Sequence, residues 1–303
     1  MEYKFYNSNT LKSVQLNEDT NVIFELNKAN CNKVFLNTLL YSSQYGCPIS
    51  FSLIRNLNST ANIGFGVGAV LDFMYELTSV SSTSIKLKHP TGDIEEFINS
   101  YKKTIATGKE VIYYVSSTTS NFIKKIVNGS ITNLTYYNGS LVAEFEYKGI
   151  TPLALSKFTR NGNTTKGWVS VTYGSNGKLQ YLFNEAEEQE FVEFTYISNY
   201  TQFVVSKKID KTTKTEIKKV VFTYSNNSLI SIKETMHGKT TPIRHTSFTK
   251  TTGAMVVKNE ISTLYSTLNY SANGVSSINM QDDEMTVTYV NDHLTNISVN
   301  GMW

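Results

Sequence analysis

The sequence predicts an all-β protein made of antiparallel β-hairpins, and three observations support this prediction. First, 19 tyrosines and 16 phenylalanines, with many valines, isoleucines and threonines, suit half-buried strands, whereas only four prolines interrupt the 303 residues. Second, apolar and polar residues alternate over short stretches, which is the period of a β-strand. Third, short turns of Asn, Gly, Ser and Asp separate these stretches at frequent intervals.

The N-terminal region, residues 1–106, contains the glycine-rich stretch "GFGVG" at 64–68. A phosphate-binding loop is not indicated, because G-x-G-x-x-G is incomplete and no G-K-[ST] follows. We therefore interpret these glycines as a bulge or sharp bend in front of an alternating strand. That strand would place Leu71, Phe73, Tyr75 and Leu77 on one face.

The end of this region has a different period. Ile94, Phe97, Ile98, Tyr101 and Ile105 recur at the spacing of one face of an α-helix. We therefore expect a short amphipathic helix from about residue 94 to 106. The helix would separate the N-terminal region from the region 107–303, although both regions can form one continuous domain.

The region 107–303 repeats a short motif. Five stretches share an apolar residue two positions before a tyrosine, a polar turn, and an apolar residue five or six positions after the tyrosine. One example is "VTYGSNGKLQYL" from residue 171. The tyrosines are Tyr136, Tyr173, Tyr224, Tyr270 and Tyr289, and the residues after the turn are Leu141, Leu179, Leu229, Val275 and Leu294.

Weaker copies of the motif lie between the strong ones. They are centred on Tyr114, Tyr196 and Phe248, with the phenylalanine in the tyrosine position. Most steps between marked positions are then 19 to 28 residues, and one is 37. A period in this range indicates a repeat architecture in which each unit buries its apolar face against its neighbours.

One unit shows how the motif would fold. Val169, Val171 and Tyr173 alternate with polar residues before the turn, and Leu179, Tyr181 and Phe183 do so after it. Alternation on both sides predicts an antiparallel hairpin with each set on one face. The Ser-Asn-Gly turn supplies the positive φ that a tight hairpin needs, and each tyrosine ring can cover the inner face while its hydroxyl meets a polar partner.

These units resemble the YD repeats of the Rhs family, in which a tyrosine is followed by a turn with Gly, a Leu, and a Thr or Ser before an Ile. No unit here has an aspartate directly after its tyrosine. The segment before the repeats is also similar to the one in Rhs-type shells, on Asn56 to Ser59, "GFGVG" at 64–68, Thr91, Gly92 and Phe97, with Ala69 where a tryptophan is usual. The resemblance covers residues 20 to 300.

The resemblance implies a strand ribbon that winds into a curved or curled sheet or a partial shell, with its tyrosines inside. Long members of the family enclose a C-terminal toxin or similar cargo. Because the chain stops at "GMW" after its last unit, we expect a short shell without such a toxin, one part of an assembly, or a curled sheet without a cavity.

No residues in the sequence indicate a catalytic, cofactor or metal site. The four histidines have no Cys, His or carboxylate neighbours at ligand spacing, although His237 and His245 could meet on facing strands. Cys31 and Cys47 can be bonded or free, and free thiols are favoured because two cysteines make no disulfide framework. Two acidic clusters, usual at solvated turns, are the remaining candidates for glycoside chemistry: Glu185, Glu187, Glu188 and Glu190, and Asp282, Asp283 and Glu284.

Three functional hypotheses follow. We favour a non-enzymatic scaffold or shell that packs against or encloses a partner polypeptide, as the resemblance implies. The first alternative is a carbohydrate or cell-surface binding module that uses exposed aromatic rings, and the second is a glycoside-active enzyme that uses the acidic clusters. A net charge of +3 with only three arginines makes nucleic acid an unexpected partner.

The sequence gives little information on location. It has no N-terminal basic segment followed by an apolar run, so no secretion signal is expected in it. No apolar stretch approaches the roughly 20 residues that span a bilayer, so membrane insertion is not expected. Export by a dedicated system, a place in a phage particle, and trimming from a bacterial surface protein all remain open.

Overall fold

The computed structural model describes residues 5–6, 11–16, 19–26, 32–42, 49–57, 65–129, 131–139, 141–146, 154–160, 168–184, 190–197, 200–208, 214–271, 274–280, 284–290 and 293–300. Within these ranges the protein is all-β, its strands are antiparallel, and no helix is present. The described residues accordingly contain no helix that is long and apolar enough to cross a membrane. The predicted fold class is therefore confirmed at the level of an all-β, antiparallel protein.

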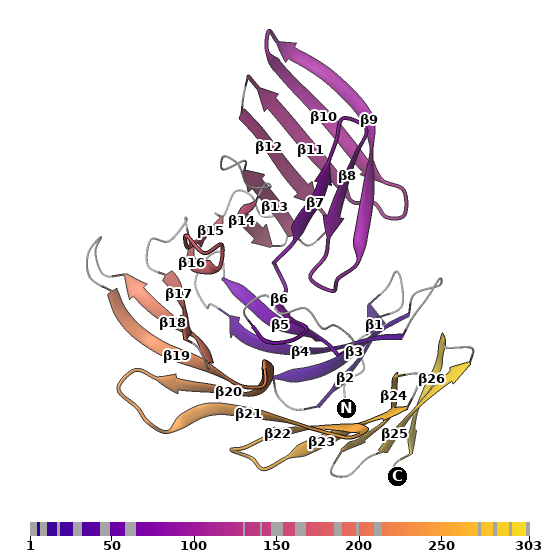
Figure 1. Cartoon of the computed structure of the whole chain (residues 1–303), viewed down its shortest axis with the longest axis vertical. Coiled ribbons are helices and arrows are strands. Elements are labelled where there is room, and N and C mark those ends of the chain that lie inside the picture. The colour runs from indigo at the N-terminus through magenta and orange to yellow at the C-terminus, as the bar shows by residue number, and fades with distance from the viewer. Residues whose placement is uncertain are drawn as a thin grey trace.

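The first strands form a separate sheet in which each strand pairs with the next along the chain. Figure 1 shows this sheet in indigo and purple near the middle of the molecule. Its strands are β1 (Phe5–Tyr6), β2 (Leu11–Gln15), β3 (Thr20–Leu26), β4 (Asn32–Ser42), β5 (Ser50–Asn56) and β6 (Ala69–Leu71).

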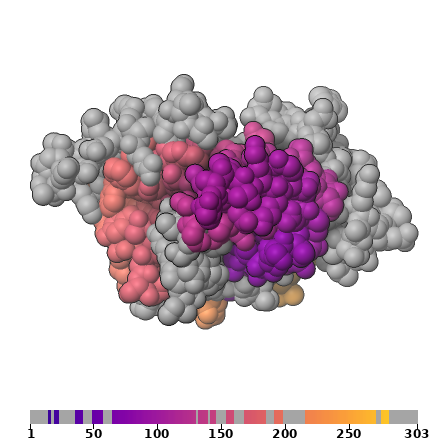
Figure 2. Space-filling view, turned by 90° about the horizontal axis from the view of Figure 1, so that it is seen from above, coloured from indigo at the N-terminus to yellow at the C-terminus, as the bar shows by residue number. Residues whose placement is uncertain are grey.

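The next strands, which we call the upper strands, lie above that sheet in Figure 1. They are β7 (Glu76–Val80), β8 (Ser84–Lys88), β9 (Ile94–Ala106), β10 (Lys109–Ser116), β11 (Phe122–Asn128), β12 (Ile131–Tyr137) and β13 (Leu141–Glu146). Each pairs with its neighbour in sequence. Figure 2 shows the molecule from above, with purple and magenta residues of these strands toward the viewer.

The remaining strands, which we call the lower strands, continue the same pairing order and pass beside and below the first sheet (Figure 1). In the described part of the chain no sheet is closed or strongly curled. The lower strands are β14 (Ala154–Arg160), β15 (Val169–Tyr173), β16 (Leu179–Asn184), β17 (Glu190–Ile197), β18 (Tyr200–Lys208), β19 (Lys214–Ser225), β20 (Ser228–Met236), β21 (Pro242–Thr251), β22 (Ala254–Asn259), β23 (Tyr265–Ser271), β24 (Gly274–Met280), β25 (Glu284–Val290) and β26 (His293–Asn300).

The predicted helix at 94–106 is wrong, because this segment is the strand β9. Its register with β10 runs from Phe97 opposite Ser116 to Ala106 opposite Lys109, and Gly108 closes the turn with a φ of 75°. Of the five apolar residues at helical spacing only Phe97 is buried. The pattern was therefore not the buried stripe of a helix, and pairing with the strongly β-prone β10 decides the structure.

The hairpins at four of the five strong repeats carry the same irregularity, whereas the β12–β13 hairpin pairs Tyr136 with Ala143 without a register shift. In β15–β16, β19–β20, β23–β24 and β25–β26 the register shifts by one residue next to the tyrosine. As a result the tyrosine lies directly opposite the apolar residue that follows the turn: Tyr173 opposite Leu179, Tyr224 opposite Leu229, Tyr270 opposite Val275 and Tyr289 opposite Leu294. A β-bulge is therefore part of these units.

The bulge corrects one prediction about the faces of the unit. Leu179, Tyr181 and Phe183 were expected on one face, but Leu179 and Leu182 are buried while Tyr181 and Phe183 are partly exposed. Because Gln180 is the extra residue of the bulge, the alternation changes face after it. Strict period-two counting across the turn therefore fails in these hairpins.

The hydrophobic core joins the first sheet to both later groups of strands. Phe51 of β5 contacts Phe194 of β17, with ring centroids 6.1 Å apart. Phe65 lies 6.1 Å from Phe222 of β19, and Phe73 stacks on Phe158 of β14 at 4.7 Å. The first sheet, together with the segments on either side of β6, therefore packs against the apolar side of the lower strands.

The glycines of "GFGVG" serve this packing. Gly66 has a φ of 95° and Gly68 a φ of 73°, and a Cβ on Gly66 would lie 2.8 Å from Cε1 of Tyr224. The backbone N–H of Val67 donates a hydrogen bond to the carbonyl of Asn227 at 2.8 Å. The glycines thus let this segment approach the turn between β19 and β20.

Candidate binding surfaces

The structure places the repeat positions on the buried side of the strands wherever it describes their side chains. Tyr114 and Tyr136 are fully buried, and Tyr173, Tyr196, Tyr224 and Tyr270 are partly buried against the core. The remaining positions are buried apolar residues: Phe248, Leu141, Leu179, Leu229 and Val275. The side chains of Tyr289 and Leu294 lie outside the described residues.

Two tyrosine hydroxyls have defined partners. Tyr114 donates to the carbonyl of Ser81 at 3.2 Å, and Tyr136 accepts a hydrogen bond from Nδ2 of Asn138 at 3.2 Å. Burial raises the pKa of Tyr173 to about 12. Burial also raises the pKa of Tyr270 to about 12, although Arg55 opposes that rise. These hydroxyls therefore stay protonated near neutral pH, and we assign them to packing.

Arg55 inserts a buried cation among three repeat units. It lies on β5, is 7% exposed, and donates from Nη1 to the carbonyl of Leu229 at 3.2 Å. Its guanidinium lies 6.0 Å from the ring centroid of Phe248. Burial lowers its pKa, and Tyr270 and Tyr224 partly restore it. Arg55 therefore ties the first sheet to β20 and β21.

Arg244 of β21 makes a second tie to the first sheet. Its guanidinium donates to the carbonyls of Leu39 and Leu40 and forms ion pairs with Asp19 at 3.4 Å and Glu234 at 2.8 Å. Because Arg244 and Glu234 are largely buried, this contact is shielded from water. We therefore treat this side of the lower strands as an internal interface.

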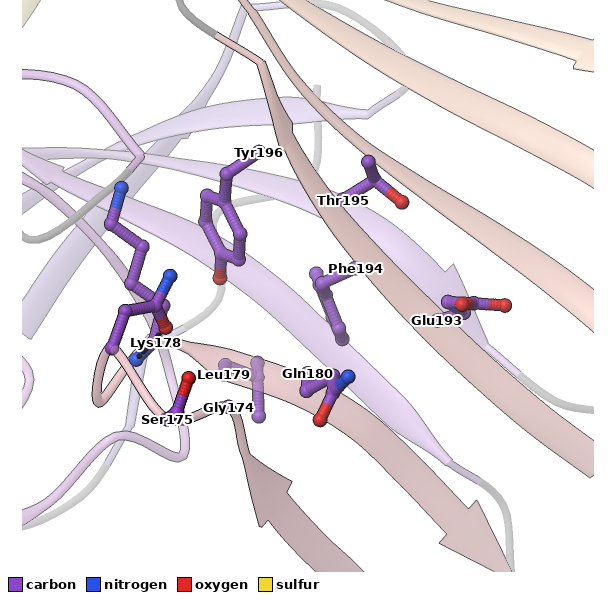
Figure 3. Close-up of a pocket in the computed structure, with 10 residues that line it drawn as sticks. Gly174, Ser175, Lys178, Leu179, Gln180, Glu193, Phe194, Thr195 and Tyr196 are labelled. Atoms are coloured by element: carbon purple, nitrogen blue, oxygen red, sulfur yellow. Dashed lines mark hydrogen bonds between the residues drawn. The ribbon is translucent and has the colours of Figure 1, made fainter.

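A pocket of about 380 Å³ lies at the turn between β15 and β16, beside β17. Figure 3 shows the side chains of Lys178, Gln180, Glu193 and Tyr196 around it. Ser175 and Asn176 of the turn line the same space. The pocket has the size of a small ligand and a mainly polar wall that includes two aromatic residues, Phe194 and Tyr196.

Contacts of the wall residues with one another and with Tyr181 hold the pocket wall. Nζ of Lys178 lies 4.9 Å from the ring centroid of Tyr196, a cation–π distance. Tyr181 donates to Glu193 at 3.5 Å, and Nε2 of Gln180 donates to the hydroxyl of Tyr181 at 3.3 Å. Such a wall could hydrogen-bond a polyhydroxylated ligand, but it holds no paired carboxylates.

A second candidate surface lies on the outer side of the upper strands, which we call the aromatic face. One row crosses four strands, and its residues pair directly opposite one another in the order Ile98, Val115, Phe122 and Tyr137. Beside this row, Tyr101 lies opposite Tyr113. The ring centroids lie 6.3 Å apart for Tyr101 and Tyr113, and 6.3 Å apart for Tyr113 and Phe122. Those of Phe122 and Tyr137 lie 4.5 Å apart. The aromatic face consists of Ile98, Tyr101, Tyr113, Val115, Phe122 and Tyr137.

The aromatic face is open to solvent to an unusual extent. Tyr101 is 55% exposed, Ile98 47% and Val115 43%. The other side of the same strands carries Tyr114 and Tyr136, both fully buried. In each Tyr-Tyr pair the repeat tyrosine is thus buried, while its neighbour lies on the aromatic face. Of the four rings on the aromatic face Tyr101 is exposed and the other three are partly buried. Such a row of apolar side chains makes this face a candidate interaction site.

A polar cluster around Glu95 fixes one rim of the upper strands. The Glu95 carboxylate accepts hydrogen bonds from Thr119 at 2.6 Å and from Asn121 at 3.2 Å, and it lies 2.9 Å from Nε2 of His89. Burial favours the protonated carboxyl, but the hydrogen bonds from His89, Ser116, Thr119 and Asn121 outweigh it and lower the pKa to about 2. This cluster clamps the turn after β10 onto β9.

The Glu95 cluster was not predicted from the sequence. Its members come from three separate turns and strands, so no local spacing could have indicated it. The lowered pKa alone would mark Glu95 as a candidate functional residue. A carboxylate saturated with hydrogen bonds has no free proton to exchange near neutral pH, so we interpret the cluster as structural.

Several predicted site residues lie outside the described residues, or their side chains do. They are Cys31, Cys47, His293 and the residues of both acidic clusters. The two histidines that could have paired do not share a contact: His237 lies 3.9 Å from Glu216, whereas His245 pairs in register with Lys233. The described residues contain no group of three metal-binding side chains.

Comparisons with known proteins do not assign the chain to a family. No protein-family model matches it, and no curated protein matches it either. The resemblance to the Rhs repeats therefore stays a prediction from the motif.

Proposed function

We propose that the protein is a non-enzymatic β-repeat scaffold that packs against a partner polypeptide through the aromatic face. The observation that carries this proposal is the partly exposed row from Ile98 to Tyr137, on strands whose other side is buried in the core. A row of rings on a rigid sheet offers large contact area at low entropic cost. It is the kind of surface that protein interfaces bury at their centre.

The role of the repeat tyrosines follows from their contacts. The side of the lower strands that carries Tyr224 and Phe248 meets Gly66 and Arg55 of the N-terminal region. In this proposal the partial shell expected of the repeats encloses the N-terminal sheet of the same chain. An external partner then meets the upper strands and not the tyrosine side.

The test uses the tagged full chain with an amine-reactive crosslinker in the cells that produce it. Lys124 lies beside Tyr113 in register on the aromatic face, and Lys103 lies opposite Val111 on the same side. We expect crosslinks from both lysines to one polypeptide at constant stoichiometry. The double variant Tyr101→Ser and Phe122→Ser should lower capture by at least about tenfold.

The matched control is Tyr265→Ser, which removes a tyrosine 51% exposed on β23. It should leave capture unchanged. Equal capture by the double variant and the control, or crosslinks scattered over many polypeptides, would contradict the proposal.

The pocket beside β17 favours a second candidate, a carbohydrate-binding module. Its wall offers Asn176, Gln180 and Glu193 as polar contacts and Tyr196 as a ring, which suits one or two sugar units. We expect a glycan array to give a defined signal that Asn176→Ala removes and Asn226→Ala, in the exposed β19–β20 turn, does not. A blank array would discard this candidate.

A further inference from the structure

The upper strands contain an open sheet edge. Strand β9 pairs with β8 through residues 94–98 and with β10 through residues 97–106. Residues 100–106 therefore have β10 on one side, while no described strand pairs with their other side. Figure 1 shows this part of β9 at the outer margin of the upper strands. Unpaired backbone N–H and C=O groups at such an edge can accept another strand.

The side chains of this edge are apolar and basic. Tyr101 and Ile105 are more than half exposed, and Lys102 and Lys103 lie between them. Lys102 pairs with Glu110 at 2.8 Å, whereas Lys103 makes no ion pair within the described part of the chain. Lys124, two strands away on the same face as Tyr101 and Lys103, is likewise without an ion pair to any described residue. Positive charge is therefore available along the edge.

These charges argue against a second copy of the chain as the occupant. Antiparallel pairing of two copies of residues 100–106 about their centre would set Lys103 opposite Lys103. Like charges directly opposite each other on paired strands are destabilising, and lysine on an edge strand commonly prevents self-association. An acidic strand would instead convert the same lysines into cross-strand ion pairs.

We propose that the edge at residues 100–106 takes up an extended, acidic segment of the partner polypeptide by β-strand addition. Backbone hydrogen bonds from the edge extend the sheet by one strand, as in other strand-addition complexes. Lys103 contacts a carboxylate of the added strand, and Tyr101 and Ile105 contact its apolar side chains. This inference rests on the proposed function and names the partner segment by its chemistry.

The probe is a synthetic peptide as long as residues 100–106 that alternates valine and glutamate, titrated into the intact protein. Two further versions of this peptide carry N-methyl groups on their backbone amides. One is methylated at the odd-numbered residues and the other at the even-numbered residues. Because only every second amide of an added strand faces the protein, one methylated peptide should lose binding and the other should keep it. A valine and lysine peptide should bind at least about tenfold more weakly.

Charge reversal sharpens the test. Lys103→Glu should weaken the acidic peptide and strengthen the valine and lysine peptide, whereas Lys250→Glu on β21 makes the same charge change far along the chain and should alter neither. Equal binding of both methylated peptides, equal binding of acidic and basic peptides, or concentration-dependent dimerisation blocked by Lys103→Pro would overturn strand addition.

The two proposals fail separately. If capture of a polypeptide depends on Tyr101 and Phe122 but both N-methylated peptides bind equally, strand addition is wrong and the scaffold function stands. If the acidic peptide binds, and only one of its N-methylated versions does, but no polypeptide is captured, then the edge binds an added strand and the scaffold function is wrong.

Discussion

The upper and lower strands are built from the same hairpin pattern, but they differ in how far their aromatic side chains are covered. Among the lower strands the aromatic side chains of the repeats meet the N-terminal region, as Phe194 meets Phe51 and Phe222 meets Phe65. In the upper strands only one of two aromatic sides is covered, so Tyr114 is buried while Tyr113 lies on the outer face. The same residue type is therefore buried on one side of these strands and partly exposed on the other.

The cause of the difference lies in the partner layer and not in the hairpins themselves. The N-terminal region supplies Phe51, Phe65 and Arg55 to the lower strands. The inner side of the upper strands is instead closed within the group itself, where the carbonyl of Ser81, in the turn between β7 and β8, accepts a hydrogen bond from Tyr114. On their outer side Ile98, Tyr101 and Val115 are exposed, although Val111 and Val142 of the same side are buried. Under the proposed function, the rings on that side contact the partner polypeptide.

The largest effect on stability is expected from removing a covered ring, which we compare with removing a ring of the aromatic face. Phe51→Ala removes a fully buried ring that contacts Phe73 and Phe194, so the free energy of unfolding should fall by about 3–5 kcal/mol. Phe122→Ala removes a partly exposed ring on the aromatic face and should cost about 1 kcal/mol. Urea denaturation of both variants measures the difference. Equal losses would contradict the division into covered and open sides.

A second comparison uses two glycines with positive φ. Gly66→Ala would strain the backbone and drive a Cβ to 2.8 Å from Tyr224, so it should cost about 2–4 kcal/mol of stability. Gly253 has a φ of 79° but open space around it, and Gly253→Ala should cost about 1–2 kcal/mol. Thermal unfolding should rank the two variants in this order. A Gly66→Ala protein as stable as Gly253→Ala would show that the contact with Tyr224 yields easily.

Part of this division could be predicted from the sequence. Tyrosine, turn and apolar residue recur at readable spacing, and each marked unit is a hairpin in the structure, as in β12–β13 and β19–β20. The bulge could not be predicted, because one extra residue in a strand leaves no local signature. It moved Tyr181 away from the face expected for it.

The binding surfaces were harder to predict than the strands. Ile94, Ile98, Tyr101 and Ile105 suggested a buried helical stripe, although all four are exposed on β9. A local pattern cannot say which apolar side receives a covering layer, because that depends on contacts such as Phe51 with Phe194 that join distant residues. The pocket and the Glu95 cluster likewise come from separate elements.

The third prediction concerns the rim between the upper strands and their turns. The pKa of Glu95 is lowered from 4.5 to about 2 in the folded protein. Its stabilising effect is therefore present above the unfolded-state pKa and is lost as the pH falls from about 4.5 toward 2, by on the order of 2–3 kcal/mol. Denaturation at several pH values should show this loss. Glu95→Gln should remove that part of the pH dependence, and an unchanged profile would contradict the assignment.

The smallest expected effect on stability separates recognition from packing most directly. Tyr101→Ser exposes little new surface, because the ring is already 55% exposed and its nearest aromatic neighbour is Tyr113 at 6.3 Å. The free energy of unfolding should therefore change by no more than about 0.5 kcal/mol. If the same substitution weakens partner capture, the ring acts in binding and not in the fold. A large loss of stability would instead place Tyr101 with the covered rings, and the contrast between the two groups of strands would not extend to β9.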